Sequence, residues 1–130
     1  MKSKYLRLRD KADKLFSKYI RLKAANGTDI VQCYSCGKVM SVKEAQAGHY
    51  MSRRYMNTRF LVHNVHPQCP HCNKWLAGNI PLYRKHLVEE YGATEVERIE
   101  ALAQTKSGVT CELMEYWIAE WKEKIKELLK

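Results

Sequence analysis

The sequence predicts an α+β fold that is mainly helical, with helices at both ends of the chain around a small metal-held centre. Three observations predict it. Apolar residues recur every three or four positions near both ends, which is typical of amphipathic helices. Two Cys-x-x-Cys pairs occupy the middle of the chain. The segment that contains these pairs is poor in long apolar runs, and such a segment usually needs a metal or disulfides to hold its shape.

The 130 residues have the length of one domain. We divide it into a basic N-terminal helix (1–27), a metal-bound core (28–80) and a helical C-terminal region (81–130). No stretch approaches the apolar length of a membrane span, and the N-terminus has no apolar signal-peptide region. We therefore expect a cytoplasmic protein, in which paired cysteines are more often metal ligands than disulfides.

The N-terminal segment is predicted to be an amphipathic helix that stops at Asn26-Gly27. Its apolar face is Leu8, Ala12, Leu15, Tyr19 and Leu22, and its other face is Lys11, Lys14, Lys18, Arg21 and Lys23. Residues 1–60 hold 14 Lys and Arg against 4 Asp and Glu, whereas residues 61–130 hold 9 against 10. A basic half suggests a polyanionic partner, most commonly a phosphate backbone. The alternative is a solvated basic helix.

In the centre, residues 30–36 are predicted to form a short strand that runs into the first cysteine turn, where Gly37 permits a tight backbone bend. Residues 39–51 suit another strand or a hairpin. Residues 52–59 are polar and basic and suggest a loop, and residues 60–62 resemble a short strand.

Further helices are predicted from Pro70 to Gly78 and from Pro81 to Gly92, because proline suits the first helical turn. Thr94 to Glu97 has the form of a capping box that opens a short helix. Thr110 caps the last helix, next to Cys111, which we interpret as a packed thiol. The apolar stripe of that helix is Met114, Trp117, Ile118, Trp121, Ile125 and Leu128.

Four cysteines, Cys33, Cys36, Cys69 and Cys72, have the spacing of a structural zinc site. Each Cys-x-x-Cys turn brings two sulfurs to one tetrahedral Zn²⁺ with little strain, and two such turns leave no open position on the ion. Two disulfides, a redox Cys-x-x-Cys and an iron–sulfur cluster are the alternatives.

His49, Asn64 and Asn73 lie among these cysteines and suit a metal-dependent phosphodiesterase. Such an enzyme needs a base to activate water and a cation to stabilise the charge that builds on phosphate. Asn64 can fix an imidazole in one tautomer by a hydrogen bond. Asn73 directly follows a zinc ligand, so its carbonyl is placed to meet a hard cation such as Mg²⁺. The alternative is that the histidine is a structural polar residue.

These three residues, interleaved with the cysteine pairs, resemble the HNH, or ββα-metal, nucleases whose third residue is Asn. The layout is also similar to that of the phage endonuclease VII type of junction-resolving nuclease. A longer set of motifs resembles the NinG/Rap recombination proteins of lambdoid phages over roughly residues 30–100: Cys-Tyr-Ser-Cys-Gly, Ala-Gly-His-Tyr at 47–50, Arg-Phe at 59–60, Asn-Val-His-Pro-Gln-Cys at 64–69, Cys-Asn at 72–73, Gly-Asn at 78–79, Tyr-Arg at 83–84 and Tyr-Gly at 91–92.

The resemblance implies an HNH-like core at 28–80 and a structure-selective DNA endonuclease, in the bacterial host, that acts on branched recombination intermediates such as Holliday junctions and D-loops. By position it implies that His49 is the general base, that Asn64 orients it and that Asn73 binds a catalytic Mg²⁺ or Mn²⁺. Many HNH sites place a second metal ligand where this sequence has Gly48. The candidates to replace it are His66, His63 and Glu44, or the DNA phosphate itself.

Basic residues near this centre are candidate phosphate contacts, which position a backbone without reading sequence: Arg53, Arg54, Arg59, Lys74, Arg84 and Lys85. Tyr50, Tyr55 and Trp75 are candidates for stacking on unpaired bases, although an apolar helix face favours packing for Trp75. Two opposed cuts at a junction favour a homodimer with the last helix as its interface. Two alternatives stay open, a less selective HNH nuclease that cuts duplex DNA and a non-catalytic zinc DNA-binding module.

Overall fold

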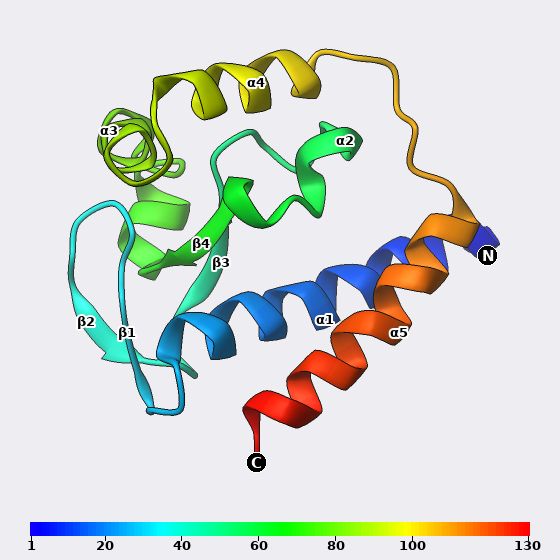
Figure 1. The fold of residues 1–130 in the computed structure, drawn as a ribbon, viewed down its shortest axis with the longest axis horizontal. Coiled ribbons are helices and arrows are strands. Elements are labelled where there is room, and N and C mark those ends of the chain that lie inside the picture. The colour runs from blue at the N-terminus through cyan, green and yellow to red at the C-terminus, as the bar shows by residue number, and fades with distance from the viewer.

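The computed structural model describes residues 1–130 and has an α+β, mostly helical architecture, as predicted (Figure 1). Short strands and turns form the centre of the chain, between long helices at either end. The elements in chain order are α1 (Lys4–Ala25), β1 (Ile30–Gln32), β2 (Val39–Ser41), β3 (Gln46–His49), α2 (Met56–Arg59), the 3₁₀ turn η1 (Val62–Asn64), β4 (Val65–Gln68), the π-type turn η2 (His71–Trp75), α3 (Ile80–Tyr91), α4 (Ala93–Ala103) and α5 (Cys111–Leu128).

The first and last helices, α1 and α5, lie side by side (Figure 1). Both helices are N-capped by a hydroxyl side chain, since Ser3 and Thr110 accept hydrogen bonds from first-turn N–H groups. Their apolar stripes meet in one core, which also takes in Phe60 and Val65 from the centre. The stripe of α5 that we expected at a dimer interface is therefore packed against α1 within the chain.

The strands form two separate antiparallel pairs, β1 with β2 and β3 with β4. In the second pair Gly48 lies opposite His66, and His49 lies opposite Val65. Because side chains alternate along a strand, His49 and Val65 share one face of this pair while Gly48 and His66 share the other. Val65 belongs to the α1–α5 core, so the His49 face is the one covered by α1.

Helices α3 and α4 form a second helical layer on the other side of the β3–β4 pair (Figure 1). Their apolar side chains pack around Tyr50 in a separate cluster of Tyr83, Leu87, Val96 and Ile99. The hydroxyl of Tyr83 donates a hydrogen bond to the carbonyl of Gly48 at 2.7 Å, which ties α3 to β3. No helix combines the length and the apolar character that crossing a bilayer would require.

Several predicted elements differ from the structure. The strand predicted at 60–62 is wrong, since β4 begins at Val65 after a 3₁₀ turn that buries the Asn64 amide. The predicted loop 52–59 contains the short helix α2, and the two strands within 39–51 belong to different sheets. Thr94 does not cap α4, because that helix already begins at Ala93 after Gly92.

Candidate metal centre and polar site

The predicted four-cysteine cluster is present, and its sulfurs are close enough to share one metal ion. The Sγ atoms of Cys33, Cys36, Cys69 and Cys72 all lie within 4.8 Å of one another, and those of Cys36 and Cys69 are 3.8 Å apart. A tetrahedral ion with Zn–S bonds of about 2.3 Å sets neighbouring sulfurs roughly 3.8 Å apart. The donor set therefore fits Zn²⁺. Cys111 lies at the start of α5 and is not part of the cluster.

Hydrogen-bond donors surround these sulfurs. The backbone N–H of Cys36 donates to Cys33 Sγ at 3.5 Å, and that of Cys72 donates to Cys69 Sγ at 3.4 Å. Burial alone would raise the pKa of the Cys33 thiol, but backbone N–H groups, that of Cys36 first, lower it to about 7. Burial raises the pKa of Cys72 to about 12. With its pKa raised this far, the Cys72 thiol is ionised at neutral pH only with a cation beside it.

His49 ends strand β3 and faces α1. Its Nε2 lies 2.9 Å from the carbonyl oxygen of Arg59. A carbonyl only accepts, so Nε2 carries the proton and Nδ1 is the unprotonated nitrogen of the neutral ring. Burial lowers the pKa of His49 to about 4. The imidazole is therefore neutral and held in one tautomer at physiological pH.

A small cavity adjoins His49 between β3 and α1. Its volume is about 100 Å³, and it is lined by Asp13, Phe16, Ser17, Ala47, His49 and Arg53. The carboxylate of Asp13 accepts two hydrogen bonds from the guanidinium of Arg59, at 2.9 and 2.5 Å. The remaining arm of Arg59 donates to the carbonyl of Arg53 at 2.7 Å. Arg59 thus holds Asp13 in place on the wall of the cavity, whereas the Arg53 side chain is exposed.

Arg59, predicted as a phosphate contact, does not suit that role. It is only 8 % exposed and its guanidinium is engaged by Asp13 and by the Arg53 carbonyl. Removing such a buried cation would leave Asp13 unpaired, so its contribution is to the fold. Arg84 is half-exposed and paired with Glu100 at 2.9 Å. The other four predicted contacts are exposed and form no ion pair: Arg53, Arg54, Lys74 and Lys85.

Asn64 is fully buried and does not contact His49. Its carbonyl accepts from the N–H of Met51 at 2.8 Å, and its amide donates to the carbonyls of Met51 and Thr58, both at 3.0 Å. The side chain thus closes the loop between Met51 and Thr58. Since Arg59 follows directly, Asn64 positions the carbonyl that holds His49. Its link to the imidazole is indirect.

Asn73 lies on the other face of the β3–β4 pair from His49. Its amide donates to Gln46 Oε1 at 2.8 Å. Gln46 and His49 are three residues apart on β3, which corresponds to about 10 Å along the strand. The structure therefore does not bring the side chains of His49 and Asn73 together.

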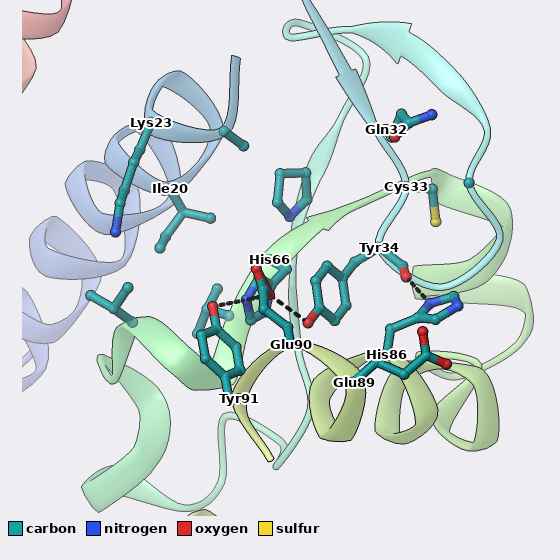
Figure 2. Close-up of a pocket in the computed structure, with 15 residues that line it drawn as sticks. Ile20, Lys23, Gln32, Cys33, Tyr34, His66, His86, Glu89, Glu90 and Tyr91 are labelled. Carbon is teal, nitrogen blue, oxygen red and sulfur yellow. Dashed lines mark hydrogen bonds and ion pairs between the residues drawn. The ribbon is translucent and has the colours of Figure 1, made fainter. Parts of the chain in front are cut away.

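None of the candidate replacement ligands lies beside Asn73. Both ring nitrogens of His66 are engaged. Nδ1 lies 3.1 Å from Tyr83 Oη, and Nε2 lies 2.9 Å from Tyr91 Oη (Figure 2). His63 pairs with Glu95, and Glu44 accepts from Ser41 at 3.0 Å. Because tyrosine hydroxyls engage both ring nitrogens of His66, the structure leaves neither of them free for a cation, and the role of His66 as a metal ligand stays a prediction.

His66 instead lines an open groove of about 740 Å³ between α1, the first cysteine turn and α3 (Figure 2). Tyr34 stacks on its ring at 3.9 Å between centroids, and the Tyr34 hydroxyl donates to Glu90 at 2.7 Å. Burial lowers the pKa of His66 to about 3. Lys23, Glu89 and Glu90 give the groove both signs of charge. It offers no anion site comparable to the basic surroundings of His49.

Among the stacking candidates, only Trp75 is strongly exposed. It is 81 % exposed on η2, directly beyond Cys72, so the expectation that it packs in the core is wrong. A five-residue π-type turn does not continue into a longer helix, and its last side chain finds no apolar neighbour. Tyr50 is buried with its hydroxyl on Glu100. Tyr55 is half-buried under the Arg54 guanidinium.

Comparison with known proteins decides the family. The family described as NinG, Bacteriophage Lambda NinG protein, matches residues 2–130. The chain belongs to the NinG family. It is 34 % identical over 99 residues to the Protein ninG of Salmonella phage P22 and 34 % identical over 97 residues to that of Escherichia phage lambda. Each match covers 74 % of the chain and 47 % of the relative, so this NinG chain spans about half the length of those relatives. No solved structure matches it.

Four residues of this NinG chain take part in the site although the sequence pattern did not single them out. They are Asp13, Ser17, Gln46 and Gln68. Gln46 lies two residues before Gly48, and strand alternation alone would have placed both on one face. No local signal marks Asp13 or Ser17, since they approach His49 only after α1 packs on the sheet.

Proposed function

We propose that this NinG chain is a metal-dependent DNA endonuclease that hydrolyses phosphodiester bonds at branched recombination intermediates, with His49 as the general base. The observation that carries the proposal is the state of the His49 ring. Its Nε2–H is held by the Arg59 carbonyl and burial keeps it neutral, so Nδ1 is free to accept a proton. The ring also borders a cavity whose lining includes the exposed residue Arg53.

In this proposal a water next to the scissile phosphate loses a proton to His49 Nδ1 as its oxygen bonds to phosphorus. The bond from phosphorus to the leaving sugar oxygen breaks in the same displacement, and that oxygen is protonated by solvent. Arg53 lines the cavity, exposed and without an ion pair, so its guanidinium is available to neutralise the phosphate. Arg54, the next residue, is also exposed and lies over the Tyr55 ring. An anionic phosphate beside His49 would raise its pKa and improve it as a base.

The catalytic cation in this proposal is Mg²⁺ or Mn²⁺, which when bound offsets the negative charge that develops on the phosphate. The oxygens that this proposal offers to the cation are the side-chain amide carbonyls of Asn73 and of its hydrogen-bond partner Gln46. This is a sparse donor set, two neutral oxygens with no carboxylate, and the DNA phosphate would supply the anionic ligand. The order β3, β4, η2 has the strand–strand–helix sequence of a ββα-metal core, with Zn²⁺ as its structural support.

Selectivity for branches is supported by one exposed aromatic residue. Trp75 projects from the cysteine-held turn beside Lys74, where it can stack on a base that has no pairing partner. A Holliday junction needs two opposed cuts, so the active form is proposed to be a homodimer. Because the apolar stripe of α5 is packed on α1, the homodimer is proposed to form through a surface other than that stripe.

One observation favours a second candidate, a non-catalytic zinc DNA-binding module. His49 and Asn73 lie on opposite faces of the β3–β4 pair, so base and cation ligand do not converge in the isolated chain. This candidate keeps the cysteine cluster and the basic surface but gives His49 a structural role. A nuclease that cuts any duplex is the third candidate, and substrate choice separates it from the first.

The deciding experiment compares cleavage of a four-way junction, a D-loop and a linear duplex, each with Mg²⁺, with Mn²⁺ and without added divalent metal. Wild type should cut the branched substrates when metal is present, and His49→Ala should lose at least about 10²-fold in rate. His63→Ala is the matched control, since His63 is remote from the cavity. No cutting by wild type would favour the binding module, and equal cutting of all three DNAs would favour the unselective nuclease. Full activity in His49→Ala would remove His49 as the base.

A further inference from the structure

One face of α1 carries four cations that the proposed site does not use. Arg7, Lys11, Lys14 and Lys18 are spaced by four, three and four residues, so they share one face of the helix. All four are exposed, and none takes part in any ion pair of the molecule. We call this set the α1 stripe.

The acidic residues of α1 do not neutralise the stripe, because both are engaged elsewhere. Asp10 pairs with Lys2 and with Arg9, and Asp13 is held by Arg59. A helix on a solvated surface usually interleaves both signs of charge in neighbouring turns. Asp10, three residues after Arg7 and four before Lys14, is the acid of α1 nearest the stripe, and its carboxylate is taken by Lys2 and Arg9.

A lysine from α5 joins the same surface. Lys122 is exposed, and the nearby ammonium of Lys11 lowers its pKa. The two lysines come from helices that are more than a hundred residues apart in the sequence but pack against each other, and neither lysine takes part in an ion pair. Like charges held together in this way destabilise the free protein, and the binding of a polyanion relieves their repulsion.

The stripe leads to the His49 cavity. Asp13 and Ser17 line that cavity. Lys14 directly follows Asp13 and Lys18 directly follows Ser17, so each lysine is about 100° around the helix from a residue of the cavity wall. Arg53 lines the same cavity from the loop that follows β3. Arg7 to Lys18 covers about 16 Å along the axis. A duplex presents a charge for every ~1.7 Å of its axis, so this length meets several phosphates.

We propose that the α1 stripe, extended by Lys122, binds the phosphate backbone of a duplex DNA arm and directs that strand to the His49 cavity. The inference rests on the proposed function for its ligand, DNA, but not on cleavage. An anionic membrane is the less suitable partner, because the apolar residues of α1 are buried against α5 and the sheet and leave nothing to insert into a bilayer. The stripe contacts phosphates only, so it adds affinity and orientation without sequence preference.

The test measures binding of a fluorescent four-way junction to the purified chain, without added divalent metal, as a function of salt. Each lysine that contacts a phosphate adds about 0.9 to the slope of log K against log salt. Lys11→Gln/Lys14→Gln/Lys18→Gln should therefore lower the slope by about 2 to 3 and weaken binding on the order of 10²-fold near 0.1 M salt. Replacing the same three lysines with Arg should retain the slope.

The matched control, Lys38→Gln/Lys106→Gln/Lys130→Gln, removes the same charge from exposed positions outside the stripe and should leave the slope almost unchanged. Equal losses in both triple variants would show an effect of net charge alone and overturn the inference. So would binding to phosphatidylserine vesicles in place of DNA. If the stripe variant binds normally while wild type cuts junctions, the inference fails and the endonuclease stands. If binding depends on the stripe but no DNA is cleaved, the inference stands and the proposed endonuclease activity fails.

Discussion

The carboxamide of Gln68 lies across Gly48, so that a Cβ at position 48 would be 1.8 Å from Gln68 Oε1 and 2.4 Å from its Cδ. Gln68 is fully buried, and its amide donates to Ser35 Oγ at 2.8 Å and to the Gly78 carbonyl at 2.7 Å. One side chain thus ties the first cysteine turn to the segment after the second. The glycine next to His49 is explained by this close approach, and position 48 is not available to a metal ligand.

Gly48→Ala should destabilise the protein by about 2 to 3 kcal/mol, because a buried carboxamide has to leave its hydrogen bonds to admit one methyl group. Urea denaturation measures the loss. Gly108→Ala is the control, since the nearest atom to its added Cβ is 4.0 Å away. Gly48→Ala combined with Gln68→Ala should cost less than the sum of the two single changes. A Gly48→Ala variant as stable as Gly108→Ala would contradict the packing explanation.

Purified protein should contain one Zn²⁺ per chain, and removing the metal should unfold the centre of the molecule. Binding energy and folding energy are the same quantity in such sites, on the order of 10 kcal/mol. Elemental analysis and thermal unfolding measure both effects. Cys72→Ser should lose the metal and most of its folded signal, whereas Cys111→Ser should retain both. A metal-free wild type with an unchanged melting temperature would exclude a structural role for zinc.

His49 should make the fold sensitive to acid. Its pKa is lowered by burial to about 4 in the folded state from the ordinary value of 6.5, so the unfolded chain binds the extra proton as pH falls through 6.5. Stability is therefore retained above that pH and lost as pH falls toward 4. The loss between pH 7.5 and pH 5 should be about 2 kcal/mol for this residue.

Urea unfolding of wild type and His49→Gln at both pH values isolates that contribution, since the cysteine cluster and His66 titrate in both proteins. The variant should lose about 2 kcal/mol less on acidification. Identical pH dependence in the two proteins would show that His49 is not buried as a neutral ring.

Trp75→Ala should leave stability within about 0.5 kcal/mol of wild type, because the side chain is 81 % exposed. It should weaken binding to a four-way junction by roughly 1 to 3 kcal/mol and binding to a linear duplex much less, if an unpaired base stacks there. Anisotropy titrations measure both DNAs. Trp121→Leu is the contrasting variant, expected to destabilise the core. Equal weakening on both DNAs would argue against stacking at a branch.

The sequence predicted the helices and the metal cluster better than the polar site. Period and capping residues are local signals, so α1 ends at the predicted Asn26-Gly27 stop and α5 begins after the predicted cap Thr110. The Cys-x-x-Cys spacing is local as well. The short strands were less predictable, because the start of β4 depends on hydrogen bonds between the Asn64 side chain and Met51 and Thr58, which lie 13 and 6 residues earlier in the chain.

The interactions of the site residues could not be predicted because they depend on which face of β3–β4 each residue occupies. The chain order suggested that Asn64 holds His49, whereas the Arg59 carbonyl does so. Arg59 in turn is fixed by Asp13, which is 46 residues away. Neither the segment around Asp13 nor the segment around Arg59 contains a sequence pattern that predicts these two interactions.

The pairing of α1 with α5 also has a consequence for the order of folding. The wall of the His49 cavity that α1 provides is supported by a helix that the ribosome makes last among the described elements. Until α5 is synthesised, Phe16 and Ile20 lack the α5 side chains that cover them in the core. Contacts between α1 and α5 are distant in sequence, and such contacts form slowly. A nascent chain should therefore hold its cysteine cluster before it has a finished polar cavity. Such a delay would keep the cavity incomplete until synthesis has passed α5.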